Sequence, residues 1–287
     1  MPETQQKQTS FETYKSSVPN TWCPGCGDFS VLHALYKALG ILQYDSQDTV
    51  IVSGIGCSGR LPIFTTCYGF HGVHGRLLPT ATGLKLANPK LHVFGVGGDG
   101  DGLAIGGGHF PHAARRNVDI TYLMLDNSTY GLTKGQASPT TGKNSSATRS
   151  LPYGAAEDNL NPIGLALAYN ASFVARGFSG QLNQLIDLIV KAAQHQGFSF
   201  LHVISPCVVF NNTYPYYNKN IVMIPETHDV KNKLAALDLW QDPGKTYVGI
   251  FHQSDIRDSY AKRCEKIIEL AQAKGKGDTN VLLDSFR

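Results

Sequence analysis

The chain has 287 residues, with 25 Lys and Arg against 22 Asp and Glu and a formal net charge of +3. This length accommodates one large α/β domain with extensions or two small domains, with room for a sizeable core. A hydrophobic share of 42% with 16% charged residues excludes a disordered chain. The weak positive balance, without any Lys/Arg run interleaved with aromatics, excludes a nucleic-acid-binding footprint.

The amino-terminal region gives no sign of export or of a membrane anchor. The first thirty residues hold no apolar core flanked by positive charge, and no later stretch reaches the roughly 18 uninterrupted apolar residues of a membrane span. We therefore expect a soluble, cytoplasmic protein without a membrane partner. Its six cysteines are better explained as metal ligands or buried thiols than as disulfides, because no secretory signal accompanies them.

In chain order, the expected elements begin with a disordered arm and continue with a helix and strands. Residues 1–20 are polar and without pattern, which indicates an arm that orders only against a partner. Asp28 is expected to cap a helix that Gly40 ends. Short apolar runs rich in β-branched residues, each followed by Gly, Asp or Asn, predict buried parallel strands at Thr49–Ser53, 91–96 and 118–125.

The second half continues the alternation after a Gly/Ser/Thr-rich connection at residues 134–150. The pattern predicts a helix at 162–169, a strand at 172–175, a longer helix and a strand at 200–204. The longer helix has its apolar residues on one face: Leu182, Leu185, Ile186, Ile189 and Val190. Beyond residue 206 we expect a tyrosine-rich loop around Tyr214 and then isolated helices in a C-terminal extension. The sequence therefore predicts the doubly wound α/β class: a mainly parallel sheet flanked by helices, with functional loops at the carboxyl ends of its strands.

A glycine-rich loop follows the predicted strand at 91–96. It contains Gly98-Asp99-Gly100, and the next predicted strand runs into Asp126-Asn127. Glycines let a backbone approach a diphosphate closely, and an Asp and an Asn at the ends of neighbouring strands are hard oxygen ligands for Mg²⁺. A Gly-Asp-Gly turn alone is often only structural. Its pairing with Asn127, however, resembles the thiamine diphosphate motif, in which a backbone carbonyl near Thr129 completes the Mg²⁺ site.

Such a site also needs a carboxylate that activates the aminopyrimidine ring of the cofactor. No glutamate lies between Glu12 and Glu157. Either an aspartate substitutes, or the activating glutamate comes from another subunit. Because thiamine diphosphate sites are generally built between two domains, we favour the second explanation and expect this chain to hold half of an active site.

Four of the six cysteines lie where they can converge. Cys23 and Cys26 form a Cys-x-x-Cys pair, and Cys57 and Cys207 each follow a predicted strand. The carboxyl ends of strands meet at one edge of an α/β sheet, so four thiolates can surround one metal centre there. Structural zinc normally takes two close pairs, so one pair and two distant single cysteines favour a [4Fe–4S] cluster over zinc. The remaining cysteines are expected to be buried thiols: Cys67 and Cys264.

Six motifs occur in order along the chain, at residues 22–27, 54–60, 74–76, 97–102, 126–127 and 130–136. Together they resemble the beta subunit of 2-oxoacid:ferredoxin oxidoreductases, from about Thr21 to Cys207. The resemblance implies thiamine diphosphate, Mg²⁺ and one [4Fe–4S] cluster as cofactors, and an alpha subunit that supplies the rest of the site. It also implies a layout of an N-terminal arm at 1–20, a thiamine diphosphate-binding domain with the cluster ligands at 21–207, and a C-terminal extension at 208–287.

The resemblance assigns roles to individual residues. The implied cluster ligands are Cys23, Cys26, Cys57 and Cys207, and the implied Mg²⁺ ligands are Asp99, Asn127 and the carbonyl of Thr129. The implied cofactor contacts are Ile55, Gly56, Cys57, Ser58, His74, Gly100, Asp101, Gly102, Leu103, Gly131, Leu132, Thr133, Lys134, Gly135 and Gln136. Two structural alternatives stay open: His74 as a hydrogen-bonded core histidine, and Asp101 as an outer carboxylate or a loop cap.

The implied reaction is the coenzyme A-dependent oxidative decarboxylation of a 2-oxoacid, in which electrons pass one at a time through the cluster to ferredoxin. Arg60 and Lys134 flank the expected site and are the candidates to hold a substrate carboxylate. The second carboxylate of 2-oxoglutarate favours that substrate, giving succinyl-CoA, over pyruvate. Arg60 alternatively contacts coenzyme A phosphates or solvent. The direction stays open, since a carboxylating synthase of the reductive citric acid cycle uses the same parts.

Two other functions compete with this one. A non-oxidative thiamine diphosphate decarboxylase needs no iron, and a nucleotide-binding subunit stabilised by zinc performs no chemistry. The bound metal and a test for thiamine diphosphate separate the three. For the oxidoreductase we expect an alpha-beta heterodimer or a dimer of such dimers.

Overall fold

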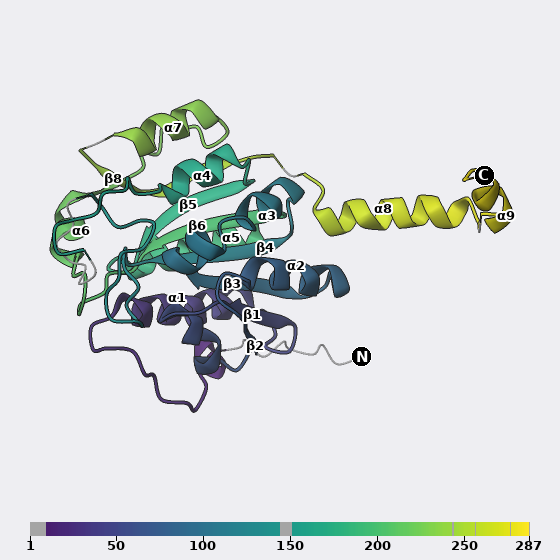
Figure 1. Cartoon of the computed structure of the whole chain (residues 1–287). Helices are drawn as coiled ribbons and strands as arrows, with labels where there is room; N and C mark the ends of the chain where they lie inside the picture. Colours follow the sequence, from purple (N-terminus) through teal and green to yellow (C-terminus); the bar gives the residue numbers. More distant parts are fainter. Residues whose placement is uncertain (1–9, 144–150, 243, 256, 276, 287) are drawn as a thin grey trace.

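The computed structural model describes residues 10–143, 151–242, 244–255, 257–275 and 277–286. In this part of the chain, a sheet with the strand order β2-β1-β3-β4-β6-β5-β8-β7 runs through the centre (Figure 1). Its strand pairs are parallel, apart from β8, which is antiparallel to β5. The expected α/β class is therefore confirmed. The strands are β1 Thr49–Ser53, β2 Tyr68–His71, β3 His92–Gly98, β4 Ile120–Asp126, β5 Phe173–Phe178, β6 Phe198–Ile204, β7 Ile221–Met223 and β8 Thr246–Gln253.

Helices cover both faces of the sheet. α1 and α5 pack against one face, and α2, α3, α4 and α7 pack against the other. The helices are η1 Phe11–Tyr14, α1 Gly27–Leu42, η2 Ser58–Phe64, α2 Leu77–Ala87, η3 Asp101–Ile105, α3 Phe110–Arg116, α4 Pro162–Ala168, α5 Leu182–Gln194, α6 Tyr214–Asn220, α7 Lys233–Gln241, α8 Tyr260–Ala273 and α9 Thr279–Asp284. No helix within the described residues has the length and apolar character that crossing a membrane requires.

The central strands send alternate side chains into two separate cores. In β4, Leu123 and Leu125 pack with α1 and α5, whereas Tyr122 and Met124 pack with the helices of the opposite face. Every residue of β4 is buried, which is why the strand is a continuous apolar run rather than an alternating one. With both faces covered, the loops that are open to a ligand lie at the carboxyl edge of the sheet.

Helix α1 differs from the prediction at both ends. It begins one residue before Asp28, with Cys26 at the N-cap position, and it continues for two residues past Gly40. Asp28 is therefore not the cap, because its carboxylate is buried in the first turn and accepts a hydrogen bond from Ser205 Oγ at 2.7 Å. Gly40 does not end the helix; instead, its missing side chain leaves room for Phe11 of η1, whose atoms would lie 3.2 to 3.3 Å from a Cβ at this position.

Part of the expected N-terminal arm is packed on the body of the same chain. Residues 1–9 lie outside the described residues, but η1 follows at once. Tyr14 in η1 is buried, and its hydroxyl lies 2.6 Å from the carbonyl of Tyr44 and 3.2 Å from that of Leu39. The expectation that this arm orders only against a partner is therefore wrong for η1, because Tyr14 is buried against α1 of the same chain.

The C-terminal extension contributes to the sheet, which the prediction of isolated helices did not foresee. The expected tyrosine-rich loop is helix α6, and β7 and β8 follow it. β8 pairs with β5, and it buries Val248 and Phe251. This pairing joins segments far apart in the sequence, so local pattern gives little sign of it. Strand β2 and helices α2 and α3 were also not predicted. Figure 1 shows α8 projecting away from the body of the molecule.

The Gly/Ser/Thr-rich connection is not a free linker where the structure describes it. Residues 144–150 of this segment lie outside the described residues. Within the described part, Ser138, Thr140 and Thr141 are buried. Thr140 Oγ1 lies 2.7 Å from Asp99 Oδ2, and Thr141 Oγ1 donates to the carbonyl of Ser128 at 2.8 Å. These hydroxyls have partners inside the protein, so their polarity does not place the segment in solvent.

Candidate active site at the carboxyl edge of the sheet

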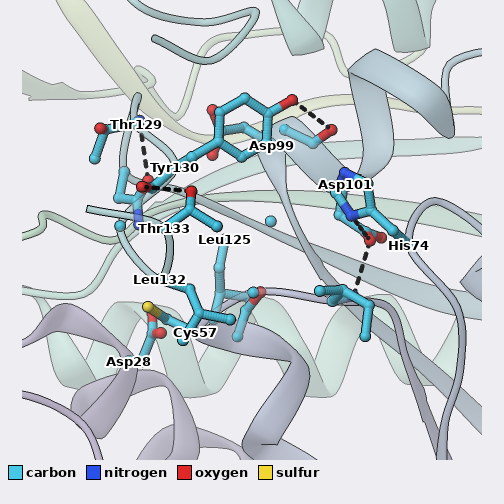
Figure 2. Close-up of a pocket in the computed structure, with 17 residues that line it drawn as sticks. Asp28, Cys57, His74, Asp99, Asp101, Leu125, Thr129, Tyr130, Leu132 and Thr133 are labelled. Atoms are coloured by element: carbon cyan, nitrogen blue, oxygen red, sulfur yellow. Dashed lines mark hydrogen bonds and ion pairs between the residues drawn. The ribbon is translucent and has the colours of Figure 1, made fainter. Parts of the chain in front are cut away.

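A cavity of about 440 Å³ lies where β1, β3 and β4 end (Figure 2). Its size is in the range of ordinary cofactor pockets. The lining residues are Asp28, Ile55, Gly56, Cys57, Ser58, His74, Gly98, Asp99, Gly100, Asp101, Leu125, Asn127, Thr129, Tyr130, Gly131, Leu132 and Thr133. The structure therefore brings together most of the residues that the sequence motifs singled out as cofactor and Mg²⁺ contacts.

Asp101 ties three segments of this cavity together. Its Oδ1 accepts the backbone N–H groups of Ile55 at 2.9 Å and Gly75 at 2.8 Å. The same oxygen lies 2.9 Å from His74 Nδ1, and Figure 2 shows the two side chains facing each other. Because a carboxylate only accepts, His74 Nδ1 carries a proton and donates it in this bond. His74 is thus a half-buried residue of the cavity wall rather than a core histidine, and Asp101 sets its orientation.

Glycine at position 100 is required by the close approach of an aromatic ring. A Cβ at Gly100 would stand 2.2 Å from the ring of Tyr130, far inside van der Waals contact. Tyr130 is half-buried and lines the cavity. The glycine therefore lets the loop after β4 close over the loop after β3.

Asp99 is a buried acid without a cationic partner. Its side chain is 2% exposed, and none of the ion pairs of the described residues involves it. Burial and the neighbouring charge of Asp126 raise the pKa of Asp99 to about 7. A buried carboxylate of this kind is costly unless a positive charge compensates it. Asn127 and Thr129 line the same cavity, so the donor set suits a hard divalent cation such as Mg²⁺.

A second cavity, of about 210 Å³, gathers the four cysteines that were expected to share a metal centre. Its lining residues are Thr21, Trp22, Cys23, Cys26, Cys57, Arg60, Asn127, Gly131, Leu132, Lys134, Cys207, Val208, Val209 and Phe210. None of the six cysteines, all of which lie in the described residues, forms a disulfide. Cys67 is buried as expected, whereas Cys264 is partly exposed.

Local hydrogen bonds explain why these cysteines meet. The N–H of Gly27, at the start of α1, donates to the carbonyl of Pro206 at 3.2 Å, which brings Cys26 next to the loop of Cys207. The indole N–H of Trp22 donates to the carbonyl of Cys57 at 2.7 Å. These bonds draw the start of α1 to the ends of β1 and β6.

The surroundings of the thiols suit an iron–sulfur cluster. A Cβ at Gly131 would stand 3.6 Å from both Cys57 Sγ and Cys207 Sγ, so the glycine leaves space beside two sulfurs. Burial, with the negative charge of Asp28 adding to it, raises the pKa of Cys57 to about 11, so a positively charged centre is needed to hold it as thiolate. Within the described residues, no group of three or more His, Cys, Asp or Glu side chains is arranged to hold a metal ion.

Several predicted contacts lie elsewhere than in the first cavity. Arg60 and Lys134 line the cysteine cavity, and Arg60 donates to Thr21 Oγ1 at 2.8 Å. Leu103 lines a neighbouring cavity together with Tyr130. The predicted contacts that line none of these three cavities are Gly102, Gly135 and Gln136.

Four residues of the first cavity were not among the candidates: Asp28, Gly98, Leu125 and Tyr130. Asp28 lies two residues after Cys26 of the Cys-x-x-Cys pair, and this position was the available sign in the sequence. Burial raises its pKa to about 6, and the hydrogen bond from Ser205 only partly opposes this. Thr140 contacts Asp99 and Asp126, and His202 contacts Asp126. No motif in the sequence indicated either of them.

The chain is similar to known proteins of one family. Residues 54–203 match the family model described as thiamine pyrophosphate enzyme, C-terminal TPP binding domain, and residues 207–269 match the model for the C terminal of the pyruvate ferredoxin oxidoreductase beta subunit. The chain is 40% identical over 273 residues to the 2-oxoacid:ferredoxin oxidoreductase 2 subunit beta of Aeropyrum pernix, covering 90% of this chain and 88% of that one. The chain belongs to the beta subunits of the 2-oxoacid:ferredoxin oxidoreductases.

Two further similarities concern this beta-subunit family. The 2-oxoglutarate synthase subunit KorB of Methanothermobacter marburgensis is 35% identical over 276 residues, which cover 95% of each chain. A solved structure described as 2-oxoglutarate:ferredoxin oxidoreductase from Magnetococcus marinus with 2-oxoglutarate, coenzyme A and succinyl-CoA bound has a TM-score of 0.92 and 39% identity, and covers 99% of this chain and 98% of that chain.

As a 2-oxoacid:ferredoxin oxidoreductase beta subunit, the chain is part of an enzyme and carries a thiamine diphosphate-binding domain. The segment that matches the thiamine pyrophosphate model contains every residue lining the first cavity except Asp28. The second model begins at Cys207.

Proposed function

We propose that this beta subunit binds Mg²⁺ and thiamine diphosphate in the first cavity and a [4Fe–4S] cluster in the second, and works with an alpha subunit. The reaction converts a 2-oxoacid, coenzyme A and two oxidised ferredoxins into acyl-CoA, CO₂, two reduced ferredoxins and a proton. The bond between the carboxylate carbon and the oxo carbon breaks, and a thioester bond to the coenzyme A sulfur forms. The two electrons released go one at a time to the two ferredoxins. We place this activity in the cytoplasm, where free thiols stay reduced.

The observation that carries this proposal is the wall shared by the two cavities. Cys57, Asn127, Gly131 and Leu132 line both of them. A site for decarboxylation and a site for an electron acceptor are thus separated by single residues. A non-oxidative decarboxylase has no use for four cysteines beside its cofactor pocket, so the shared wall favours the oxidoreductase.

The chain's own residues supply the binding and orientation. Asp99, Asn127 and the carbonyl of Thr129 are the proposed Mg²⁺ ligands, and His74, held by Asp101, lines the cavity in which the cofactor would bind. When bound, thiamine diphosphate supplies the electron sink that lets CO₂ leave a 2-oxoacid. The proposed cluster ligands are Cys23, Cys26, Cys57 and Cys207.

An alpha subunit is proposed to supply the activating carboxylate. The acidic side chains that line the first cavity are Asp28, Asp99 and Asp101. Asp28 is bonded to Ser205, Asp99 is a proposed metal ligand, and Asp101 holds His74. Each is engaged in another contact or role, so the partner subunit is the better source of the acid that protonates the cofactor ring.

We propose 2-oxoglutarate as the substrate and succinyl-CoA as the product. The support is the Magnetococcus marinus enzyme, described with 2-oxoglutarate, coenzyme A and succinyl-CoA bound. Arg60 and Lys134 stay the proposed cations for substrate or coenzyme A anions. They line the cysteine cavity and not the first one, so we expect them to act from the cysteine side of the shared wall.

The test is metal analysis and spectroscopy of the alpha-beta complex, co-expressed and purified without oxygen. We expect about four iron and four sulfide per beta subunit, and an EPR signal of the reduced cluster that appears on adding 2-oxoglutarate with coenzyme A. A panel of 2-oxoacids then ranks 2-oxoglutarate against pyruvate. Zinc in place of iron, or decarboxylation without cluster reduction, would refute the proposal.

A further inference from the structure

A buried polar cluster connects the first cavity to the interior of the sheet. Arg176 on β5, His202 on β6 and Asp126 at the end of β4 belong to it, and none of the three is more than 9% exposed. Arg176 Nε donates to His202 Nδ1 at 3.1 Å, and His202 Nε2 lies 2.8 Å from Asp126 Oδ2. The cluster therefore crosses the neighbouring strands β5, β6 and β4 towards the loop after β3 that contains Asp99.

The donor and acceptor atoms fix the direction of each hydrogen bond in this cluster. A guanidinium only donates, so His202 Nδ1 must accept, and the ring proton lies on Nε2. The Nε2–H group then donates to Asp126 Oδ2. The other carboxylate oxygen of Asp126 accepts the N–H of Ser128 at 2.8 Å and its Oγ–H at 3.0 Å. Asp126 is thus a carboxylate held in one orientation from both sides.

Thr140 stands between this fixed carboxylate and Asp99. Its Oγ1 lies 2.8 Å from Asp126 Oδ1 and 2.7 Å from Asp99 Oδ2. A hydroxyl has a single proton, so it can donate to one of the two carboxylates at a time. The other contact sets a lone pair of the hydroxyl against the second carboxylate, which is unfavourable unless Asp99 carries a proton or a cation compensates its charge. A divalent cation held by Asp99 would supply the compensating charge, and the contact with Thr140 would then restrict how the carboxylate turns towards the ion.

We propose that Thr140 is a positioning residue for the divalent cation of the first cavity: it links the fixed carboxylate of Asp126 to Asp99 and so sets the orientation in which Asp99 meets the ion. This inference rests on the proposed cofactor site. It adds to that site a residue of the Gly/Ser/Thr-rich connection at residues 134–150. Removing a side chain that hydrogen-bonds to a metal ligand typically weakens metal binding 10- to 100-fold.

The next residue along the chain offers a matched control. Thr141 is also buried, but its contacts lie within the loop. Its Oγ1 donates to the carbonyl of Ser128 and accepts the N–H of Ser138, both at 2.8 Å. Loss of the Thr141 hydroxyl therefore tests the fold of the loop, whereas loss of the Thr140 hydroxyl tests the link between the two carboxylates.

The experiment measures metal affinity rather than turnover. The alpha-beta complex, with its cluster oxidised, is freed of metal and thiamine diphosphate and then titrated with Mn²⁺ in excess thiamine diphosphate, while EPR counts the free Mn²⁺. We expect Thr140→Val to raise the dissociation constant about 10- to 100-fold. Thr140→Ser should restore it to the wild-type value, and Thr141→Val should leave it within about threefold of that value. Iron content and the melting temperature of the metal-free complexes confirm that each variant is assembled.

Two results overturn the proposal. An unchanged constant in Thr140→Val means that Asp99 is oriented without this hydroxyl, and an equal loss in Thr140→Val and Thr141→Val means that only the loop fold matters. If the valine variant does not assemble, Thr140→Ala removes the same hydroxyl without adding bulk and carries the same expectation. A wild-type complex that binds no Mn²⁺ with thiamine diphosphate refutes the proposed cofactor site instead.

Discussion

Replacing Asp101 by asparagine should loosen the two segments whose three donor groups converge on one of its carboxylate oxygens. Asp101 Oδ1 accepts from the N–H groups of Ile55 and Gly75 and from His74 Nδ1, all at 2.8 to 2.9 Å. The second oxygen, Oδ2, is buried and has no hydrogen-bond partner. Asparagine keeps the shape of the side chain but removes its charge and puts an amide N–H₂ group at one of the two oxygen positions.

The expected cost follows from these contacts. A hydrogen bond to a charged acceptor contributes about 1.5–3 kcal/mol and one to a neutral acceptor about 0.5–1.5 kcal/mol, so three bonds lose about 3 kcal/mol in total. The amide nitrogen at the Oδ2 position adds a buried donor without an acceptor, at about 1–3 kcal/mol. A loss of 3 kcal/mol or more corresponds to a fall in melting temperature of about 6 °C or more for a chain of this size.

Two measurements on the alpha-beta complex check this reasoning. Differential scanning calorimetry should give the fall in melting temperature, and titration calorimetry should give about tenfold weaker thiamine diphosphate binding, because Ile55 and His74 line the cavity. Asp229→Asn is the control, since Asp229 is exposed and its carboxylate accepts the N–H of Lys231 within a local turn. A melting temperature within about 1 °C of wild type, together with unchanged cofactor affinity, would refute the role given to Asp101.

Three other perturbations test separate parts of the structure. Gly100→Ala puts a Cβ 2.2 Å from the ring of Tyr130, so calorimetry should find thiamine diphosphate binding weakened at least about tenfold. The control Gly108→Ala, whose Cβ meets nothing within 4 Å, should bind the cofactor normally. Equal affinity in both variants would contradict the steric role given to Gly100. Cys57→Ala should lower the iron content of the complex. Cys67→Ala, which removes a buried thiol outside the second cavity, should leave the iron content unchanged. A wild-type iron content in both variants would show that Cys57 is not a cluster ligand. Burial lowers the pKa of His195 from 6.5 to about 4, so its contribution to stability is present above pH 6.5 and is lost as the pH falls towards 4. His195→Gln should therefore shrink the drop in melting temperature between about pH 7 and pH 5, and a drop as large as in wild type would argue against this.

Parts of the sheet could be predicted from local sequence alone. β1 was predicted to the residue, and β3 and β4 to within two residues at each end, because strands buried on both faces are continuous runs of β-branched and aliphatic residues. β2 escaped prediction because all four of its residues are exposed. β8 escaped because its place depends on pairing with β5, a contact between distant segments.

The sequence by itself determined which chemical groups stand at the ends of the strands. Asp99 and Asn127 follow two neighbouring strands, and the cysteines precede a helix or follow a strand, so their meeting at one edge follows from parallel topology. Only the tertiary structure decided which cavity each loop residue enters. It placed Arg60 beside the cysteines and brought Thr140 from a linker-like segment to Asp99. The physical reason is that strand periodicity is encoded in neighbouring residues, whereas the return path of a loop is set by hydrogen bonds between groups far apart in the chain.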